Sequence, residues 1–179
     1  MKQPEGSMST VPASYPRALK PPTGELVTLT DNLIDAAIFA SRESPRKRII
    51  LPFHDGPENT LHRMLNAVQP SSYIRPHRHL DPPKDEALVL LRGALTFYTF
   101  HEDGTVNEIS RVKAGTASFG IDVKAGVFHT FVATEPDTVV FEVKPGPWSP
   151  ATDKDFATWA PDEGAEGCDE FMDRLLRMG

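Results

Sequence analysis

The chain has 179 residues, of which 39% are hydrophobic and 25% charged, a composition typical of one globular domain with a packed core. Lys and Arg number 19 against 25 Asp and Glu, and the resulting net charge of −6 with a pI of about 5.5 argues against binding to nucleic-acid phosphates. The single cysteine, Cys168, excludes an intramolecular disulfide and any Cys-rich zinc site, so the six histidines remain as candidate metal ligands.

The first part of the chain predicts a tail followed by one helix. Residues 1–24 contain five prolines and no apolar period, and we expect them to be flexible. From Thr30–Asp31, two possible N-caps, apolar residues recur at helical spacing as far as Ser44. The longest apolar run, 87–91, is far too short to cross a bilayer, and no basic-then-apolar leader is present. We therefore expect a cytoplasmic protein without membrane insertion.

Short runs separated by turn residues follow the helix, which is typical of antiparallel strands. Asp103–Gly104, between two such runs, predicts a β-hairpin. Eight strands at this close spacing favour an all-β jelly roll or small barrel, within a domain spanning residues 25–148. The expected strands are 62–69, 73–79, 86–92, 94–101, 106–112, 116–120, 128–134 and 138–144.

Residues 149–179 predict a C-terminal extension that packs on the barrel. Phe156 and Trp159 are its expected anchors, and 169–178 predicts a short amphipathic helix with one apolar face. That face suits a cover for the core or an oligomer contact better than a membrane surface. Jelly-roll sheets have edges and apolar faces that pairing covers, so we expect a homodimer. The apolar face comprises Phe171, Met172, Leu175 and Leu176.

Three histidines and one glutamate are placed to bind a metal. In a strand, His77 and His79 project from the same face and can reach one ion, although such a pair by itself is more often a surface or hydrogen-bonded pair. Glu86 begins an apolar strand, where a carboxylate needs a partner, and His129 begins another strand. Three imidazoles and a carboxylate suit one divalent ion, namely Fe, Mn, Ni, Co or Zn.

These residues resemble the two signature motifs of the cupin superfamily, which read here His77-x-His79-x6-Glu86-x6-Gly93 and Gly120-x5-Gly126-x2-His129. The resemblance implies a cupin jelly roll, a double-stranded β-helix, with the three histidines and Glu86 as ligands. Two departures stand out. Six residues separate His79 from Glu86 where three or four are usual, so Asp81 or Asp85 could bind in place of Glu86. Lys124 stands where the second motif usually has proline.

A closer resemblance covers roughly residues 30–163. It is to the WbuC family of cupin-fold metalloproteins, a family associated with bacterial surface-polysaccharide synthesis, and it implies no established reaction. The matching segments are 65–67, 73–79, 90–93, 126–130, 140–147 and 153–157.

Strand parity extends the candidate site to Arg75 and Glu142. Arg75 shares the parity of His77 and could bind a substrate carboxylate or phosphate, or alternatively form an ion pair at the rim. Glu142 could act as a general acid or base, or hydrogen bond to a ligand histidine. Arg63 and Asn66 have opposite parity, so at most one of them points inward.

The remaining histidines and the cysteine carry no predicted function. His54 and His101 are expected in loops, with His101 exposed, and His62 lacks the spacing of the ligand group. Cys168 has no companion histidine and is not expected to be a nucleophile.

The residues and the resemblance together predict a metal-dependent enzyme for a small polar substrate. The metal would act as a Lewis acid. The resemblance places a sugar or sugar nucleotide and an isomerase- or epimerase-like reaction first. The alternatives are a mononuclear Fe(II) dioxygenase and a non-catalytic sugar-binding or regulatory module, because one barrel hosts many chemistries.

Overall fold

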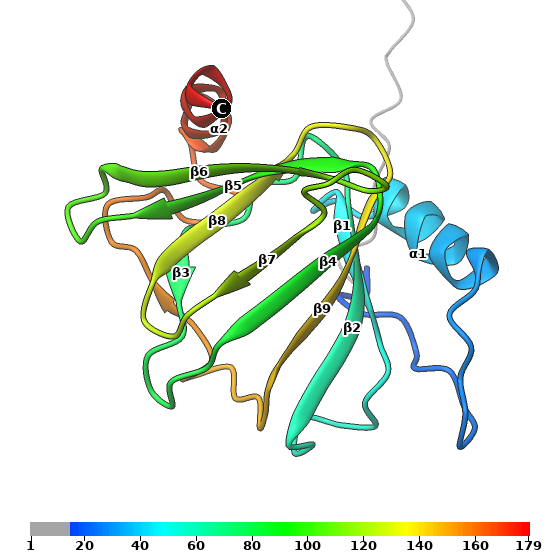
Figure 1. Cartoon of the computed structure of the whole chain (residues 1–179). Helices are drawn as coiled ribbons and strands as arrows, with labels where there is room; N and C mark the ends of the chain where they lie inside the picture. The colour runs from blue at the N-terminus through cyan, green and yellow to red at the C-terminus, as the bar shows by residue number, and fades with distance from the viewer. Residues whose placement is uncertain (1–14) are drawn as a thin grey trace, which may run out of the picture.

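The computed structural model describes residues 15–179, and its core is a pair of antiparallel sheets that face each other (Figure 1). One sheet has the order β1-β2-β9-β4-β7 and the other β10-β3-β8-β5-β6. This is the expected jelly roll. The elements are α1 (Asp31–Glu43), β1 (Arg48–Pro52), β2 (Leu61–Val68), β3 (His77–Arg78), β4 (Glu86–Arg92), β5 (Ala94–Phe100), β6 (Val106–Lys113), β7 (Gly120–Val123), β8 (Phe128–Ala133), β9 (Thr138–Pro145), β10 (Asp155–Phe156) and α2 (Cys168–Met178).

Three apolar clusters hold the layers together. The cluster between the sheets includes Leu88, Phe97 and Val140 and fills one end of the barrel. A second cluster joins α1 to the outer face of the β1-β2-β9 region, and a third joins α2 to the outer face of β5 and β8. β5 is therefore buried on both faces, which is why its sequence is almost continuously apolar.

The structure departs from the predicted strands where proline or a turn interrupts pairing. Pro76 has no N–H to donate, and only His77–Arg78 of the expected strand 73–79 is paired. The expected strand at 116–120 is irregular backbone as far as residue 119, and β7 begins at Gly120. β1 and β10 were not predicted. The Asp103–Gly104 hairpin is confirmed, with Gly104 at a φ of 84°.

The two ends of the described chain pack on the barrel. Residues 1–14 of the predicted tail lie outside the described residues, but Ala18 forms a parallel bridge to Ile50 in β1. At the other end, Trp159 contacts Phe100 and Phe128, so it is an anchor as expected, whereas Phe156 is half-exposed.

The expected domain boundaries, after residues 24 and 148, stay a prediction. No helix among residues 15–179 is long and apolar enough to span a membrane.

Candidate metal centre

A cavity of about 520 Å³ opens between the sheets at the end that the apolar cluster leaves unfilled. Alternation along the strands decides which side chains line it. In β4 Glu86 and Leu88 face inward, and in β9 Glu142 and Lys144 do so. The cross-strand register sets Glu142 beside Leu88 on one side. β4 and β9 therefore each place a charged side chain on the cavity wall beside apolar ones.

The structure brings the four sequence-predicted metal ligands together. His77, His79, Glu86 and His129 are all buried, and one ligand atom from each lies within 4.8 Å of the others. Opposite ligands of one ion lie about 4.2 Å apart when each bond is about 2.1 Å, so small side-chain movements would close the set. His77 pairs directly with His129 across β3 and β8, which fixes two of the ligands opposite each other.

The ring orientations fit a metal. Nδ1 of His77 faces the Arg75 carbonyl oxygen at 2.9 Å, Nδ1 of His129 faces the Val127 carbonyl oxygen at 2.9 Å, and Nδ1 of His79 hydrogen bonds to the carbonyl oxygen of Asp153. A carbonyl only accepts, so each Nδ1 donates to it and each Nε2 is left for another partner. Burial lowers the pKa of His77 well below its usual value, which keeps that ring neutral.

The Nε2 atoms of His79 and His129 both lie near Oε2 of Glu86, at 3.6 and 3.1 Å. Nε2 of His79 is buried without a hydrogen bond among the described residues. Nε2 of His129 is within hydrogen-bond distance of Oε2 of Glu86, so one carboxylate oxygen faces both rings. A buried polar atom without a partner is costly, and a divalent ion would satisfy both histidines and the carboxylate at once. These four residues could therefore hold one divalent ion.

The alternative ligands point away from the cavity. Asp85 is exposed and accepts a hydrogen bond from the backbone N–H of Ala125 at 2.9 Å, and Asp81 is exposed as well. Glu86 is the buried carboxylate of this segment. Lys124, at the position where proline is usual, pairs with Asp85 and so ties the two turns together.

The extra residues between His79 and Glu86 carry a buried lysine that the sequence analysis missed. Lys84 is 2% exposed, and its Nζ donates to the Pro147 carbonyl oxygen at 2.6 Å and to Oδ1 of Asp153 at 2.8 Å. The backbone of Asp153 in turn accepts from His79. Lys84 thus clamps the segment that orients a metal ligand. The burial of Lys84 could not be predicted, because a proline-rich segment with several charged residues is ordinarily exposed to solvent.

Glu142 lies beside the ligand group, as its parity predicted. Its Oε2 accepts from Nδ2 of Asn66 at 3.3 Å, and its Oε1 lies 3.5 Å from Nζ of Lys144, which is 3.8 Å from Oε1 of Glu86. Burial and the nearby Glu86 charge raise the pKa of Glu142 to about 7. Burial also lowers the pKa of Lys154, in the same cavity, to about 8. Asn66 is the inward-facing member of the Arg63/Asn66 pair.

Arg75 is placed elsewhere. Its Nε and Nη2 donate to the Ala157 carbonyl oxygen at 3.1 and 2.7 Å, and its Nη1 pairs with Asp162. It does not line the cavity, and Ile74 does so instead. The assignment of Arg75 to the substrate is therefore corrected to the alternative ion pair. The physical reason is the irregular backbone before β3, which ends strand parity at Pro76.

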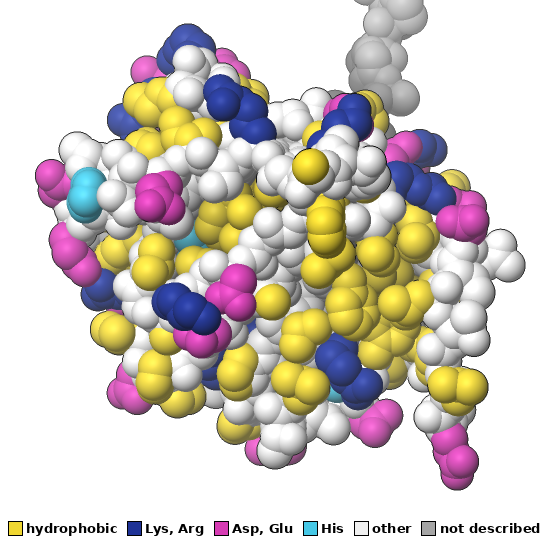
Figure 2. All heavy atoms as spheres, viewed as in Figure 1, with side chains coloured by type: hydrophobic (Ala, Val, Ile, Leu, Met, Phe, Trp, Pro, Cys, Tyr) yellow, Lys and Arg dark blue, Asp and Glu magenta, His cyan; other side chains and the backbone are white. Residues whose placement is uncertain are grey.

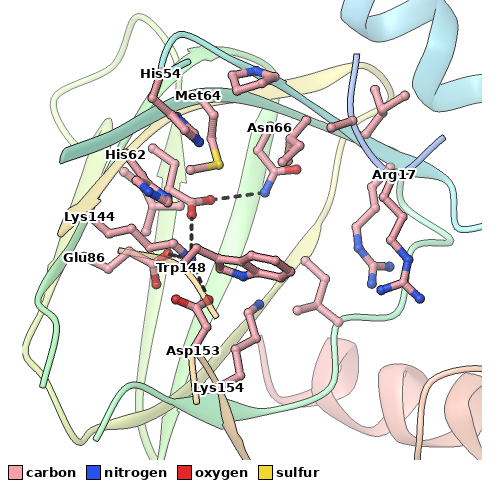
Figure 3. Close-up of a pocket in the computed structure, with 18 of the residues that line it drawn as sticks. Arg17, His54, His62, Met64, Asn66, Glu86, Lys144, Trp148, Asp153 and Lys154 are labelled. Carbon is pink, nitrogen blue, oxygen red and sulfur yellow. Dashed lines mark hydrogen bonds and ion pairs between the residues drawn. The ribbon is translucent and has the colours of Figure 1, made fainter. Parts of the chain in front are cut away.

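Other residues of the cavity were assigned no function from sequence. His54 and His62 stack with ring centroids 4.1 Å apart, and both line the wall (Figure 3). Trp148 also lines it. His101 is exposed, as expected. Sequence reasoning had no signal for His54, because it follows β1 in an irregular loop.

Comparison with protein families gives a match to part of the chain. Residues 29–112, less than half of the chain, match a family described as a domain of unknown function (DUF6016). No curated protein matches the chain.

Solved structures with a similar arrangement include KdgF from Halomonas sp., at 18% identity and a TM-score of 0.46, covering 60% of this chain and 86% of that one. Cellulomonas parahominis L-ribose isomerase is similar at 17% identity and a TM-score of 0.49, covering 63% and 70%. An uncharacterized conserved protein with a double-stranded β-helix domain from Klebsiella pneumoniae has 17% identity and a TM-score of 0.49, covering 69% and 88%. Because these values are low, the fold assignment rests on the strand order and register described above.

Proposed function

We propose that this protein is a metal-dependent enzyme that acts on a small polar substrate, with His77, His79, Glu86 and His129 as ligands of one divalent ion. The observation that carries the proposal is the convergence of buried Nε2 atoms on Glu86 while the Nδ1 atoms face backbone carbonyls. A bound divalent ion would supply Lewis acidity that polarises a carbonyl or hydroxyl oxygen.

Glu142 is the residue that we propose to move a proton. Asn66 and Lys144 hold its carboxyl group on the cavity wall beside Glu86. An isomerase or epimerase that works through an enediolate takes a proton from a carbon next to a carbonyl and returns it to another position or face, and a positioned carboxylate can do this. Lys154 lines the same cavity and can balance negative charge on the substrate.

A sugar or sugar nucleotide is the substrate class that we propose first. Trp148 lines the cavity and is 43% exposed, so its ring is available to a ligand. The negative face of an aromatic ring favours the partly positive C–H face of a sugar. The cavity volume lies within the range of roughly 300–1,000 Å³ typical of small-molecule sites. A role in surface-polysaccharide synthesis, implied by the resemblance to the WbuC family, belongs to this proposal.

Metal content tests the site. The untagged protein is purified and its bound metals are measured by mass spectrometry, together with the variants His79→Ala and Glu86→Gln. We expect about one divalent ion per wild-type chain and a large loss in both variants. His101→Ala, which changes an exposed histidine outside the cavity, should retain the full complement. Full metal content in both site variants would refute the proposed ligands.

Solvent exchange tests the reaction. The metal-loaded protein is incubated in D₂O with a panel of aldoses, ketoses and nucleotide sugars, and deuterium at carbon is followed by NMR. We expect exchange with at least one class, and its loss in Glu142→Gln although that variant retains metal. Oxygen uptake by the iron-loaded protein without exchange would instead favour the Fe(II) dioxygenase. Binding of a sugar without any turnover would favour a binding module.

We also propose a homodimer formed through the outer face of the β1-β2-β9-β4-β7 sheet. Val89 and Leu91 on β4 are 40% and 36% exposed, and Phe39 on α1 is 67% exposed. Figure 2 shows hydrophobic side chains gathered on this side of the molecule. A second copy of the chain would cover this apolar surface, which is costly to leave in water.

A further inference from the structure

Three arginines line the cavity away from the candidate metal centre. Arg17 comes from the segment that bridges to β1, Arg46 precedes β1 and Arg48 begins it. Figure 3 shows Arg17 across the cavity from Glu86 and Lys144. The cavity is thus a single space with the candidate ligands at one end and guanidinium groups at the other.

The positive charge of this arginine cluster is only partly balanced. Glu163 is the carboxylate that pairs with it among residues 15–179, at 2.7 Å from Nε of Arg46 and 2.7 Å from Nη2 of Arg48. Arg17 has no ion-pair partner within the described part of the chain. One carboxylate against three guanidinium groups leaves two positive charges uncompensated, which matches the charge of a phosphate monoester or a diphosphate linkage.

The cluster is also built into the fold. The Arg48 side chain is 11% exposed, and its Nη1 donates to Oγ of Ser72 at 3.0 Å and to the Tyr73 carbonyl oxygen at 2.7 Å. Burial and the neighbouring charges of Arg46 and Arg17 lower the pKa of Arg48, although Glu163 opposes this. A fixed guanidinium group among like charges is a site where an anion would relieve repulsion.

We infer that Arg17, Arg46 and Arg48 form a subsite for a phosphoryl group of the substrate, at the far end of the cavity from the candidate metal centre. This inference rests on the proposed function for the identity of the reacting part of the substrate. It narrows the substrate class from sugars in general to phosphorylated sugars and nucleotide sugars. The phosphoryl group anchors one end of the molecule while the sugar extends toward Glu86 and Glu142.

Calorimetric titration of the metal-loaded, full-length protein tests the inference with four probes: glucose, glucose 1-phosphate, UDP-glucose and inorganic phosphate. We expect a phosphorylated sugar to bind at least about tenfold more tightly than glucose. Arg17→Ala and Arg46→Ala remove the less buried arginines, so folding is preserved. Each should weaken that binding about tenfold to a hundredfold, as loss of a charge-assisted hydrogen bond does, and leave glucose binding unchanged.

The control is Arg111→Ala, which removes an exposed arginine of β6 outside this cavity and should change nothing. Equal affinity for glucose and its phosphorylated forms, or normal phosphate binding in both site variants, would overturn the inference. So would inorganic phosphate that binds more tightly than both esters, because the cluster would then serve a free ion rather than a substrate.

The Glu86→Gln variant separates this inference from the proposed function. If the wild type binds no metal and exchanges no deuterium while arginine-dependent binding of phosphorylated sugars persists, the proposed function fails and the subsite stands. If metal and exchange are found but the arginine variants bind normally, the subsite fails alone. We expect Glu86→Gln to lose metal and to retain the arginine-dependent part of the binding.

Discussion

Replacing Lys84 by methionine should destabilise the fold and loosen the candidate metal centre together. The side chains of Lys84 and Asp153 are 2% and 3% exposed, and their 2.8 Å ion pair is shielded from water. Removing one partner of a buried pair costs about 3–5 kcal/mol, because the other charge is left in the interior. Lys144, 3.4 Å from Asp153, retains part of the compensation. The Pro147 carbonyl oxygen loses a donor, worth about 1 kcal/mol.

We therefore expect Lys84→Met to lower the free energy of unfolding by about 3–4 kcal/mol, a large part of the roughly 5–15 kcal/mol of a typical domain. Urea denaturation in chelator-treated buffer measures this loss without a contribution from metal. Because the carbonyl group of Asp153 orients His79, metal affinity should also fall about 10- to 100-fold, as found when an outer partner of a ligand is lost.

Lys113→Met is the matched control. Lys113 pairs with Glu135 at the surface, where both side chains are about half-exposed, and its loss should cost less than about 1 kcal/mol. The double variant of Lys84→Met with Asp153→Asn should recover part of the lost stability, because no unpaired charge remains. Equal losses in Lys84→Met and Lys113→Met would refute the reasoning.

Three further predictions concern a glycine at a positive φ, the pH dependence of stability and the oligomeric state. Gly93→Ala should cost at least about 2 kcal/mol more than Gly115→Ala in thermal unfolding, because both have positive φ but only a Cβ at Gly93 would strike the β9 backbone, at 2.8 Å. Burial lowers the pKa of His62 in the folded protein. Below about pH 6.5 the unfolded chain therefore binds more protons than the folded one. The free energy of unfolding should fall as pH drops through that value, and it should fall less in His62→Gln. Val89→Glu should produce monomers in analytical ultracentrifugation if the proposed dimer face is right, whereas a wild-type monomer at micromolar concentration would contradict the dimer.

The barrel and the ligand group could be predicted from sequence because both depend on short-range regularities. Two-residue alternation placed His77 beside His79 and set Glu142 facing inward. The same rule failed at Arg75, because one proline ends the pairing on which alternation depends. Alternation carried on to His79, one residue past β3, but did not extend back across Pro76.

The rest of the site depends on contacts between distant segments. Lys84 and Asp153 are 69 residues apart in sequence, and neither lies in a regular strand. The pairing of Glu163 with Arg46 spans 117 residues. Charged residues in proline-rich loops are ordinarily solvent-exposed, and their burial here is decided by how the C-terminal segment crosses the barrel. No local pattern encodes that path.

The path of residues 153–163 also has a consequence for how the protein matures. This segment supplies the Asp153 carbonyl oxygen to His79, pairs Phe156 with His77 across β10 and β3, and brings Glu163 to Arg46. A ribosome delivers the N-terminal part first, so the nine strands before this segment, β1 to β9, can collapse while His77 and His79 still lack these contacts. A nascent chain stalled before residue 153 would lack the carbonyl group that orients His79. Under the proposed function, the candidate ligands would therefore reach their final arrangement only near the end of synthesis.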